Sequence, residues 1–322
     1  MGIAMPKSLR ALIGSALAVS LGLAFVMGLL GSVNKEMRTT SYRSAVGAQK
    51  PKKILLMNDV SIAYTDSGGD GQVLLCLHAI GHGARDFEGL SRRLAPDYRV
   101  IALDFPGHGN SGSDSQPASG TRYAELLAQF IEKLNLDSVV LLGNSIGGAA
   151  AIRYASLHPE KVKALVLCDT GGLGKPDWTS RIFAGAFTQF FAAGRRGAFW
   201  FPWAFSRYYG KVLLKEPARE ERDRIVRSAY EIAPILEQAW RSFAKTEENL
   251  IPLLPRLRCP VFLAWAKDDI VLPLKRNAPF FEKFPSRRAE IFEGGHAAFL
   301  EDPDHFEQAV RRFLSEESSI PR

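Results

Sequence analysis

The stretch Val139–Gly148, which reads VVLLGNSIGG, decides the fold of this chain. Four apolar residues typical of a buried strand end at Gly143, and a stretch that favours a helix follows from Ala149. Serine between two glycines at this spacing predicts a tight strand-to-helix turn, because a Cβ two residues to either side would clash with the helix. The turn would lift the Ser145 hydroxyl above the sheet. It would also place the Ile146 N–H at a helix N-terminus, where it can stabilise an oxyanion.

A carboxylate and a histidine follow downstream, as a nucleophilic serine requires. One apolar run leads into the segment KDDIVLP, and a later one leads into EGGH. Carboxylates at the carboxyl ends of parallel strands lie at the functional edge of such a sheet. We therefore predict a triad of Ser145, Asp269 and His296, in which His296 takes the serine proton and Asp269 orients the imidazole. Asp268 and Asp169 are alternative acids.

The order of the elements predicts an α/β fold. Short apolar runs alternate with helical patterns over residues 54–170 and again over 258–322, which indicates a mostly parallel sheet covered by helices on both faces. The expected strands are Val60–Thr65, Val73–Leu77, Tyr98–Asp104, Ser138–Leu142, Ala164–Cys168, Val261–Trp265 and Ala289–Phe292. The expected helices are Ala84–Leu94, Thr121–Leu134, Ile146–Leu157, Pro273–Lys283 and Asp304–Leu314. Between them, residues 171–257 differ in composition and are predicted to form an inserted helical cap.

The N-terminal part of the chain reads as a membrane segment followed by a linker. Ala11–Val33 contains no charged residue and would span about 34 Å as a helix. We predict that residues 1–33 form an uncleaved single-pass anchor, with a cleaved signal peptide as the alternative. Residues 34–53 are polar and basic and are predicted to form a tether. Basic residues after the apolar run outnumber those before it, so the side of the membrane stays open.

The net charge of +7 is unevenly distributed. Residues 1–53 contain eight lysines and arginines against one glutamate, and residues 171–257 contain fourteen against nine acidic residues. No nucleic-acid-binding motif accompanies this charge, so we interpret it as membrane-proximal and predict no nucleic-acid partner. Cys76, Cys168 and Cys259 lie in or beside apolar runs without ligand-like spacing. This favours buried thiols over a disulfide framework or a zinc site.

Four motifs together resemble the α/β-hydrolase superfamily. They are LHAIGHG at Leu77–Gly83, DFPGHGNS at Asp104–Ser111, the GNSIGG turn, and KDDIVLP paired with GGHAAFLEDP. The resemblance covers about residues 54–170 and 258–318. It implies an eight-stranded sheet and, together with the cap, a serine hydrolase similar to esterases, lipases and meta-cleavage-product hydrolases.

The resemblance also implies roles for several residues of the first two motifs. Ile80 corresponds to the residue whose backbone N–H completes the oxyanion hole with that of Ile146. His78 and His108 correspond to positions that structure their loops. His82, beside the expected oxyanion loop, is a candidate for the pocket wall.

The predicted cap is rich in aromatic residues. Phe183, Phe187, Phe190 and Phe191 recur at the spacing of one helix face, and further rings follow over Phe199–Tyr209. About half of these rings would pack the cap against the core, and the others would face the site or a membrane surface. The predicted substrate pocket consists of His82, Phe183, Phe187 and Trp265.

These features predict a membrane-tethered serine hydrolase that cleaves a small lipophilic carboxylic ester through an acyl-enzyme on Ser145. No metal or organic cofactor is predicted, and the oligomeric state stays open. One alternative within the same fold is hydrolysis of a carbon–carbon bond in vinylogous diketones, which the GNSIGG turn, the cap and Trp265 favour by resemblance. A non-catalytic ligand-binding protein that retains the fold is a third interpretation.

Overall fold

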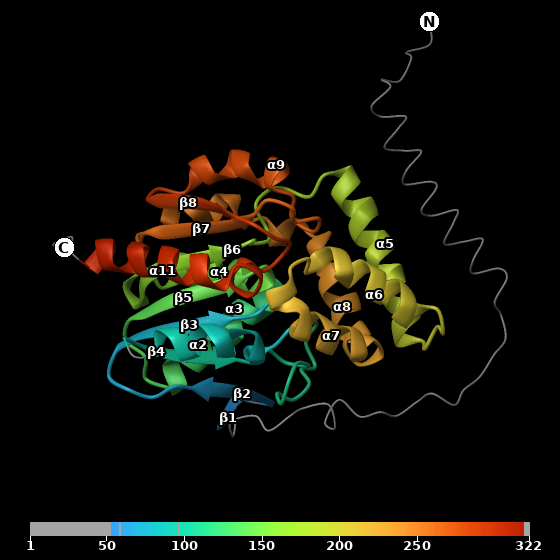
Figure 1. Cartoon of the computed structure of the whole chain (residues 1–322), viewed down its shortest axis with the longest axis horizontal. Coiled ribbons are helices and arrows are strands. Elements are labelled where there is room, and N and C mark those ends of the chain that lie inside the picture. The colour runs from blue at the N-terminus through green and yellow to red at the C-terminus, as the bar shows by residue number, and fades with distance from the viewer. Residues whose placement is uncertain (1–52, 58, 96, 319–322) are drawn as a thin grey trace, which may run out of the picture. The chain divides into compact units, whose positions relative to one another are not determined.

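The structure is a computed structural model that describes residues 53–57, 59–95 and 97–318 (Figure 1). The predicted anchor and all of the predicted tether except Lys53 lie outside these residues. Lys53 itself begins the first strand.

The predicted single-pass membrane location is contradicted within the described residues. None of their helices is both long and apolar enough to cross a membrane. The helix α5 (Trp178–Arg195) has 18 residues, which rise about 27 Å, and it carries Arg181 and Arg195. A spanning helix needs about 20 mostly apolar residues. The uncharged run Ala11–Val33, on which the prediction rested, lies outside the described part of the chain.

An eight-stranded sheet, in the order β1-β2-β4-β3-β5-β6-β7-β8, forms the centre of the described chain. β2 pairs antiparallel with β1 and β4, and the remaining pairings are parallel. This confirms the predicted mostly parallel sheet. The strands are β1 (Lys53–Met57), β2 (Val60–Asp66), β3 (Gln72–Leu77), β4 (Tyr98–Leu103), β5 (Val139–Asn144), β6 (Val162–Cys168), β7 (Val261–Ala266) and β8 (Arg287–Phe292).

Helices cover the sheet on both faces, as predicted. In Figure 1, α2 (Glu88–Leu94) and α11 (Pro303–Ser318) lie in contact in front of the sheet, and α3 (Gly120–Lys133) and α4 (Ile146–Leu157) lie in contact behind it. The short helices α9 (Leu274–Asn277) and α10 (Ala298–Glu301) follow β7 and β8. Because both faces are covered, every residue of β5 and β7 is buried, and these strands are apolar almost throughout.

One predicted helix is shorter than expected. Instead of a single helix over Pro273–Lys283, the structure has α9 followed by a 3-10 helix, Ala278–Lys283. Pro279 lies at the start of the second segment. Proline lacks the N–H that an α-helix needs and clashes with the preceding turn, so the α-helical hydrogen bonds stop before it.

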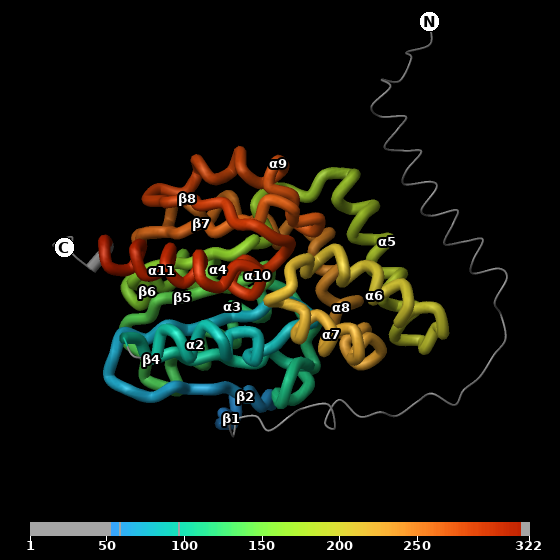
Figure 2. The backbone as a smooth tube through the Cα atoms, viewed as in Figure 1, coloured from blue at the N-terminus to red at the C-terminus, as the bar shows by residue number. Residues whose placement is uncertain are grey.

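Four further α-helices lie between β6 and β7, and we call them the inserted helices. They are α5, α6 (Phe201–Val212), α7 (Arg219–Arg227) and α8 (Ala229–Phe243). Figure 2 follows the chain from β6 through these helices, gathered at one end of the sheet, and back to β7. Aromatic rings hold them together: Phe187 stacks on Trp240 with ring centroids 4.4 Å apart, and Phe191 and Phe201 are fully buried. Such pairs add to the stabilisation from burial alone.

The turn between β5 and α4 is formed by backbone in close contact with backbone. A Cβ on Gly143 would lie 2.6 Å from the Cα of Gly148, inside the following helix. A Cβ on Gly147 would lie 2.3 Å from the carbonyl oxygen of Leu77, at the end of β3. The second clash therefore involves the neighbouring strand rather than the helix that the sequence analysis expected. Both glycines are needed because no side chain fits at either position.

This packing predicts a large difference between two glycine-to-alanine variants. Gly147→Ala forces α4 away from β3 and should lower the free energy of unfolding by about 1–3 kcal/mol or more, as overpacking does. Gly185→Ala is the matched control, since Gly185 lies inside α5 and its added Cβ meets nothing within 4 Å. Alanine there should stabilise the helix by about 0.5–1 kcal/mol. Urea unfolding of both variants measures the contrast, and equal stability of the two would contradict it.

Candidate active site

Three polar side chains follow three strands at the carboxyl edge of the sheet. Ser145 follows β5, Asp269 follows β7 and His296 follows β8, and all three are buried. Ser145 has φ 55° and ψ −116°, a backbone conformation that L-residues rarely adopt and that is often found at functional sites. The Nδ1 atom of His296 lies 2.8 Å from Oδ2 of Asp269. This geometry is the one expected when an acid, here Asp269, orients a base, here His296.

Asp269 is held in place by its own loop. Its Oδ1 accepts hydrogen bonds from the backbone N–H groups of Val271, at 2.7 Å, and Leu272, at 3.0 Å. Because these two bonds occupy Oδ1, the other carboxylate oxygen of Asp269, Oδ2, faces His296. The neighbouring Asp268 is exposed, so its carboxylate is solvated.

Asn144 links the turn of Ser145 to the loop of His296. Its side-chain amide donates to the carbonyl oxygens of His296, at 2.9 Å, and Cys168, at 3.0 Å. The Ser145 N–H donates to the same Cys168 carbonyl at 3.1 Å. The sequence pattern predicts no role for Asn144. A buried side-chain amide needs hydrogen-bond partners, and the sequence does not show which residues supply them.

Two buried histidines shape the loop that carries Ile80. The Nε2 atom of His108 accepts a hydrogen bond from the Gly81 N–H at 2.9 Å, while its Nδ1 donates to the Pro106 carbonyl at 3.0 Å. His78 accepts from the Phe105 N–H at 2.9 Å through its Nε2. Burial lowers the pKa of His108 to about 4, so its ring is neutral and keeps Nε2 as an acceptor.

Two backbone N–H groups are candidates for the predicted oxyanion hole. The N–H groups of Gly81 and His82 are occupied, by His108 and by the Ala79 carbonyl, but these bonds leave that of Ile80 uncommitted. Ile146 is the first residue of α4, and its N–H is one of the four that have no acceptor inside a helix. Ile80 and Ile146 are both buried, which favours strong electrostatic stabilisation of a developing oxyanion.

The charge of the acid governs the titration of His296. Burial alone would lower the pKa of the imidazole, but the negative charge of Asp269 and its hydrogen bond outweigh this and raise it. Asp169, the alternative acid, lies at the end of β6, where its Oδ1 accepts from the Ala266 N–H at 2.8 Å. Burial, and then the nearby charge of Asp269, raise the pKa of Asp169 well above its usual range. A raised pKa favours the protonated form of this carboxyl group.

Glu301 connects the His296 loop to the inserted helices. Its buried carboxylate accepts hydrogen bonds from the N–H of Gly295, at 2.6 Å, and from those of Leu214 and Lys215, just after α6. The His296 N–H in turn donates to the carbonyl of Val212, the last residue of α6, at 2.8 Å. These bonds fix the backbone at His296 and at the residue before it.

His82 takes part in a second buried link to the inserted helices. Its Nδ1 contacts Asp86, whose other oxygen lies 3.0 Å from Nη2 of Arg224 on α7. All three side chains are buried. Burial would raise the pKa of Asp86, but the charges and hydrogen bonds of His82 and Arg224 hold it below its usual range. The loop that carries Ile80 is therefore anchored to α7.

The described residues contain no group of three or more His, Cys, Asp or Glu side chains that could hold a metal ion. The three cysteines are buried free thiols. The chemistry that the arrangement can perform is nucleophilic attack by Ser145 assisted by His296.

Comparisons with known proteins show the family of the chain. A sequence profile described as "alpha/beta hydrolase fold" matches residues 72–303. The chain belongs to this family. Among the similar proteins is a 2-hydroxy-6-oxononadienedioate/2-hydroxy-6-oxononatrienedioate hydrolase from a Pseudomonas species. It is 26% identical over 266 residues, which make up 79% of this chain and 92% of that protein.

Solved structures of other hydrolases share the architecture of this α/β-hydrolase. A thermophilic esterase from Thermogutta terrifontis superposes with a TM-score of 0.71 and 22% identity, covering 84% of this chain and 99% of the esterase. This likeness shows the fold. A membrane phospholipase A, described as a bacterial virulence factor, superposes with a TM-score of 0.69 and 25% identity, covering 97% of this chain and 99% of the phospholipase.

The aromatic residues predicted for the pocket of this α/β-hydrolase lie in two different places. Phe183 and Phe187 lie on α5 in contact with each other and with Trp240 of α8, and Phe183 is 48% exposed. Trp265 is fully buried beside Phe281, and its Nε1 donates to the Leu272 carbonyl at 2.9 Å. These contacts place Trp265 beneath the loop of the acid.

Tyr208, which the sequence analysis did not single out for the pocket, lies on α6 against Phe187, with ring centroids 5.1 Å apart. Burial raises the pKa of Tyr208 well above its usual range, and Tyr209 and then the charge of Asp269 add to this effect. The only sign of Tyr208 in the sequence was its membership of the aromatic run, which does not say which ring packs against Phe187.

Three aspartate-to-asparagine variants test the assignment of the acid. Asp269→Asn should lower kcat by roughly 10⁴-fold, because the asparagine holds the wrong imidazole tautomer. Asp268→Asn should have little effect, since that side chain is exposed. Asp169→Asn should also be mild, because asparagine resembles a neutral carboxylic acid in shape and charge. Steady-state kinetics on folded variants measure the series, and a larger loss in Asp169→Asn than in Asp269→Asn would overturn the assignment.

The pH dependence provides a second test. The neutral imidazole is the active base, so kcat/KM should fall as the pH drops through the raised pKa of His296. In Asp269→Asn the negative charge is absent, so burial dominates and lowers the pKa of His296. The fall of the remaining activity at acidic pH should therefore move to lower pH. A limb that stays in place would mean that another group titrates.

Glu301→Gln tests the link to the inserted helices. A glutamine has one acceptor oxygen and presents an NH₂ group to N–H donors, so at least one of the three backbone bonds is lost. Misplacement of His296 should lower kcat by roughly 10- to 100-fold with a smaller change in KM. Glu307→Gln is the control. Glu307 lies on α11 and pairs with Arg311 of the same helix, so this change should leave both constants unchanged.

Proposed function

We propose that the protein is a serine hydrolase that cleaves a small lipophilic carboxylic ester through an acyl-enzyme on Ser145. The observation that carries the proposal is the hydrogen-bonded pair of Asp269 and His296, joined through Asn144 to the strained turn of Ser145. A buried base beside a serine in such a turn is an arrangement for activating the hydroxyl.

The proposed reaction has two halves. Ser145 Oγ attacks the ester carbonyl while His296 takes its proton, and the N–H groups of Ile80 and Ile146 stabilise the resulting oxyanion. The tetrahedral intermediate collapses, and the alcohol leaves with the proton from His296. A water molecule, deprotonated by His296, then attacks the acyl-enzyme. The carboxylic acid departs, and the proton returns to Ser145.

The inserted helices support a lipophilic substrate. Phe187, Tyr208 and Trp240 form a continuous group of rings. Pockets for apolar ligands combine such rings with a few placed polar groups. The similarity to a membrane phospholipase A, at 25% identity over nearly both whole chains, also favours an ester with an apolar acyl chain.

Hydrolysis of a carbon–carbon bond is the second candidate. It is favoured by the similarity to a 2-hydroxy-6-oxononadienedioate/2-hydroxy-6-oxononatrienedioate hydrolase over 92% of that protein. The chemistry performed on one fold varies among relatives, so the substrate has to decide between the two. A ligand-binding protein without turnover is the third candidate.

A labelling experiment and a substrate panel distinguish the three. A fluorophosphonate probe should label the wild-type protein and not Ser145→Ala, because the probe reacts with an activated serine. p-Nitrophenyl esters of increasing acyl length should be cleaved with a kcat/KM that rises with chain length, and a vinylogous diketone should be cleaved slowly. Faster turnover of the diketone would favour carbon–carbon hydrolysis, and an unlabelled Ser145 would favour the binding protein.

A further inference from the structure

Three side chains of the inserted helices lie closest to Gly81, the residue after Ile80. The atoms that a Cβ on Gly81 would meet are Oη of Tyr209 at 3.1 Å, Cδ2 of Leu236 at 3.3 Å and Cδ1 of Ile232 at 3.6 Å. All three side chains are buried. The start of the same loop touches Gly147, two residues after Ser145. The inserted helices therefore bring two apolar groups and one hydroxyl to the loop of the proposed oxyanion donor.

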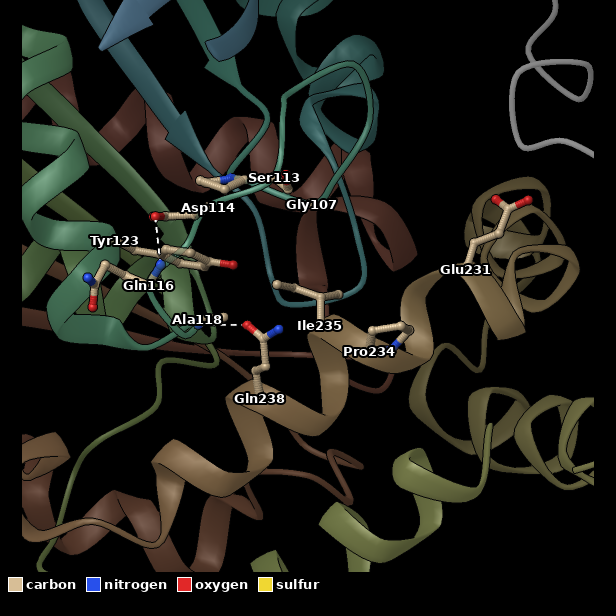
Figure 3. A pocket seen from close by; sticks show the side chains of 11 residues that line it. Gly107, Ser113, Asp114, Gln116, Ala118, Tyr123, Glu231, Pro234, Ile235 and Gln238 are labelled. Carbon is tan, nitrogen blue, oxygen red and sulfur yellow. Dashed lines mark hydrogen bonds between the residues drawn. The ribbon is translucent and has the colours of Figure 1, made fainter. Parts of the chain in front are cut away.

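The helix α8 has a different neighbour on its other side. A Cβ on Gly107 would lie 3.2 Å from Cδ1 of Ile235, which lines a pocket of about 170 Å³ (Figure 3). Neither Gly81 nor Tyr209 lines that pocket. The contacts at Gly81 therefore belong to a separate place, on the side of α8 that faces the loop of Ile80.

Two side chains beside Gly81 each have a polar atom without a partner. The hydroxyl of Tyr209 and Nε2 of His82 form no hydrogen bond with any residue that the structure describes. Each residue is only 3% exposed, and the two ring centroids are 6.0 Å apart. In the described chain, the fully covered polar atoms without a partner are Tyr123 Oη, Asn144 Oδ1, Arg153 Nε and Thr170 Oγ1. Tyr209 Oη and His82 Nε2 are not among them, so each keeps accessible surface that a ligand can reach.

The surroundings fix the hydrogen-bonding character of both atoms. The Tyr209 ring packs against Phe205 with centroids 4.7 Å apart. Burial, and then the charge of Asp86, raise the pKa of Tyr209, so its hydroxyl stays protonated and can donate. Nδ1 of His82 contacts Asp86, whose other oxygen lies 3.0 Å from Arg224. A carboxylate paired with an arginine only accepts, so Nδ1 carries a proton, and Nε2 of the neutral ring is left as an acceptor.

We propose that Tyr209 and His82 bind a hydroxyl group of the substrate, so that the preferred substrate is a hydroxy ester. A hydroxyl can accept from Oη of Tyr209 and donate to Nε2 of His82, whereas a ketone or ether oxygen only accepts. The apolar part of the substrate packs against Ile232 and Leu236. An ester without the hydroxyl would bury both polar atoms unpaired, which is unfavourable. The inference rests on the proposed ester hydrolysis for the reaction, but the binding can be measured without turnover.

Binding to the full chain carrying Ser145→Ala tests the preference. Three esters of similar size serve as ligands in NMR titrations. Ethyl butyrate has no hydroxyl, ethyl 3-hydroxybutyrate has one on the acyl side, and 2-hydroxyethyl butyrate has one on the alcohol side. At least one hydroxy ester should bind about 3- to 10-fold more tightly than ethyl butyrate, as one net hydrogen bond provides. Binding of both hydroxy esters no tighter than that of ethyl butyrate would overturn the proposal.

Variants in the same background locate the hydrogen bonds. Tyr209→Phe should lower the ratio of hydroxy-ester affinity to ethyl butyrate affinity by about 3- to 10-fold. His82→Asn should do the same, because the asparagine amide can replace Nδ1 on Asp86 but not Nε2. Tyr230→Phe is the matched control: it removes a tyrosine hydroxyl of α8 that is bonded to the Ala198 carbonyl at 2.9 Å, and it should leave the ratio unchanged.

A constant ratio in Tyr209→Phe would mean that the tyrosine acts only on structure, and it would overturn the proposal. If Tyr209→Phe does not fold, His82→Asn decides in its place by the same ratio. Turnover by the protein with Ser145 intact separates this inference from the proposed function. Selective binding of a hydroxy ester without its hydrolysis would contradict only the proposed function. Hydrolysis of all three esters with equal kcat/KM, unaltered in its selectivity by Tyr209→Phe, would contradict only the hydroxyl site.

Discussion

The close contact of backbone with backbone around Ser145 is the constraint on which the site depends. Gly147 touches the end of β3, and Gly143 touches the start of α4, so the turn between β5 and α4 has one possible path. This path gives Ser145 its positive φ and brings the first N–H of α4 beside it. The strain is tolerated because the surrounding sheet and helix determine the geometry completely. The proposed nucleophile and one proposed oxyanion donor therefore depend on the same packing.

The inserted helices are tied to the site by buried polar bonds as well as by aromatic packing. Glu301 binds the backbone before His296 and the backbone after α6, and Arg224 of α7 reaches Asp86 behind the loop of Ile80. If one of these buried charged side chains is removed, its partners stay buried without a charge or hydrogen bond to balance them, which is strongly unfavourable. The inserted helices thus also hold the loops of His296 and Ile80 in place. Changes in them should affect the rate as well as the specificity.

Several elements could be predicted because their signals are local. The alternation of apolar runs with helical patterns predicted a mostly parallel sheet covered on both faces, and the structure and the family match confirm it. The turn at Ser145 could be recognised from the local spacing of its glycines, although only the clash at Gly143 is local and the one at Gly147 involves β3. The helix over Pro273–Lys283 was too long because Pro279 interrupts the hydrogen bonds. The membrane location rested on one apolar run outside the described residues, and the helices inside them contradict it.

The sequence by itself determined the family, the order of the strands and helices along the chain, and the candidate nucleophile, base and acid. Each of these depends on residues close together in the chain, whose spacing reflects steric and hydrogen-bonding rules. Only the tertiary structure decided that Asn144 and Glu301 connect to the His296 loop and that Trp265 supports the acid loop. These outcomes depend on contacts between segments distant in the chain, and the packing that brings such segments together leaves no periodic signal in the sequence.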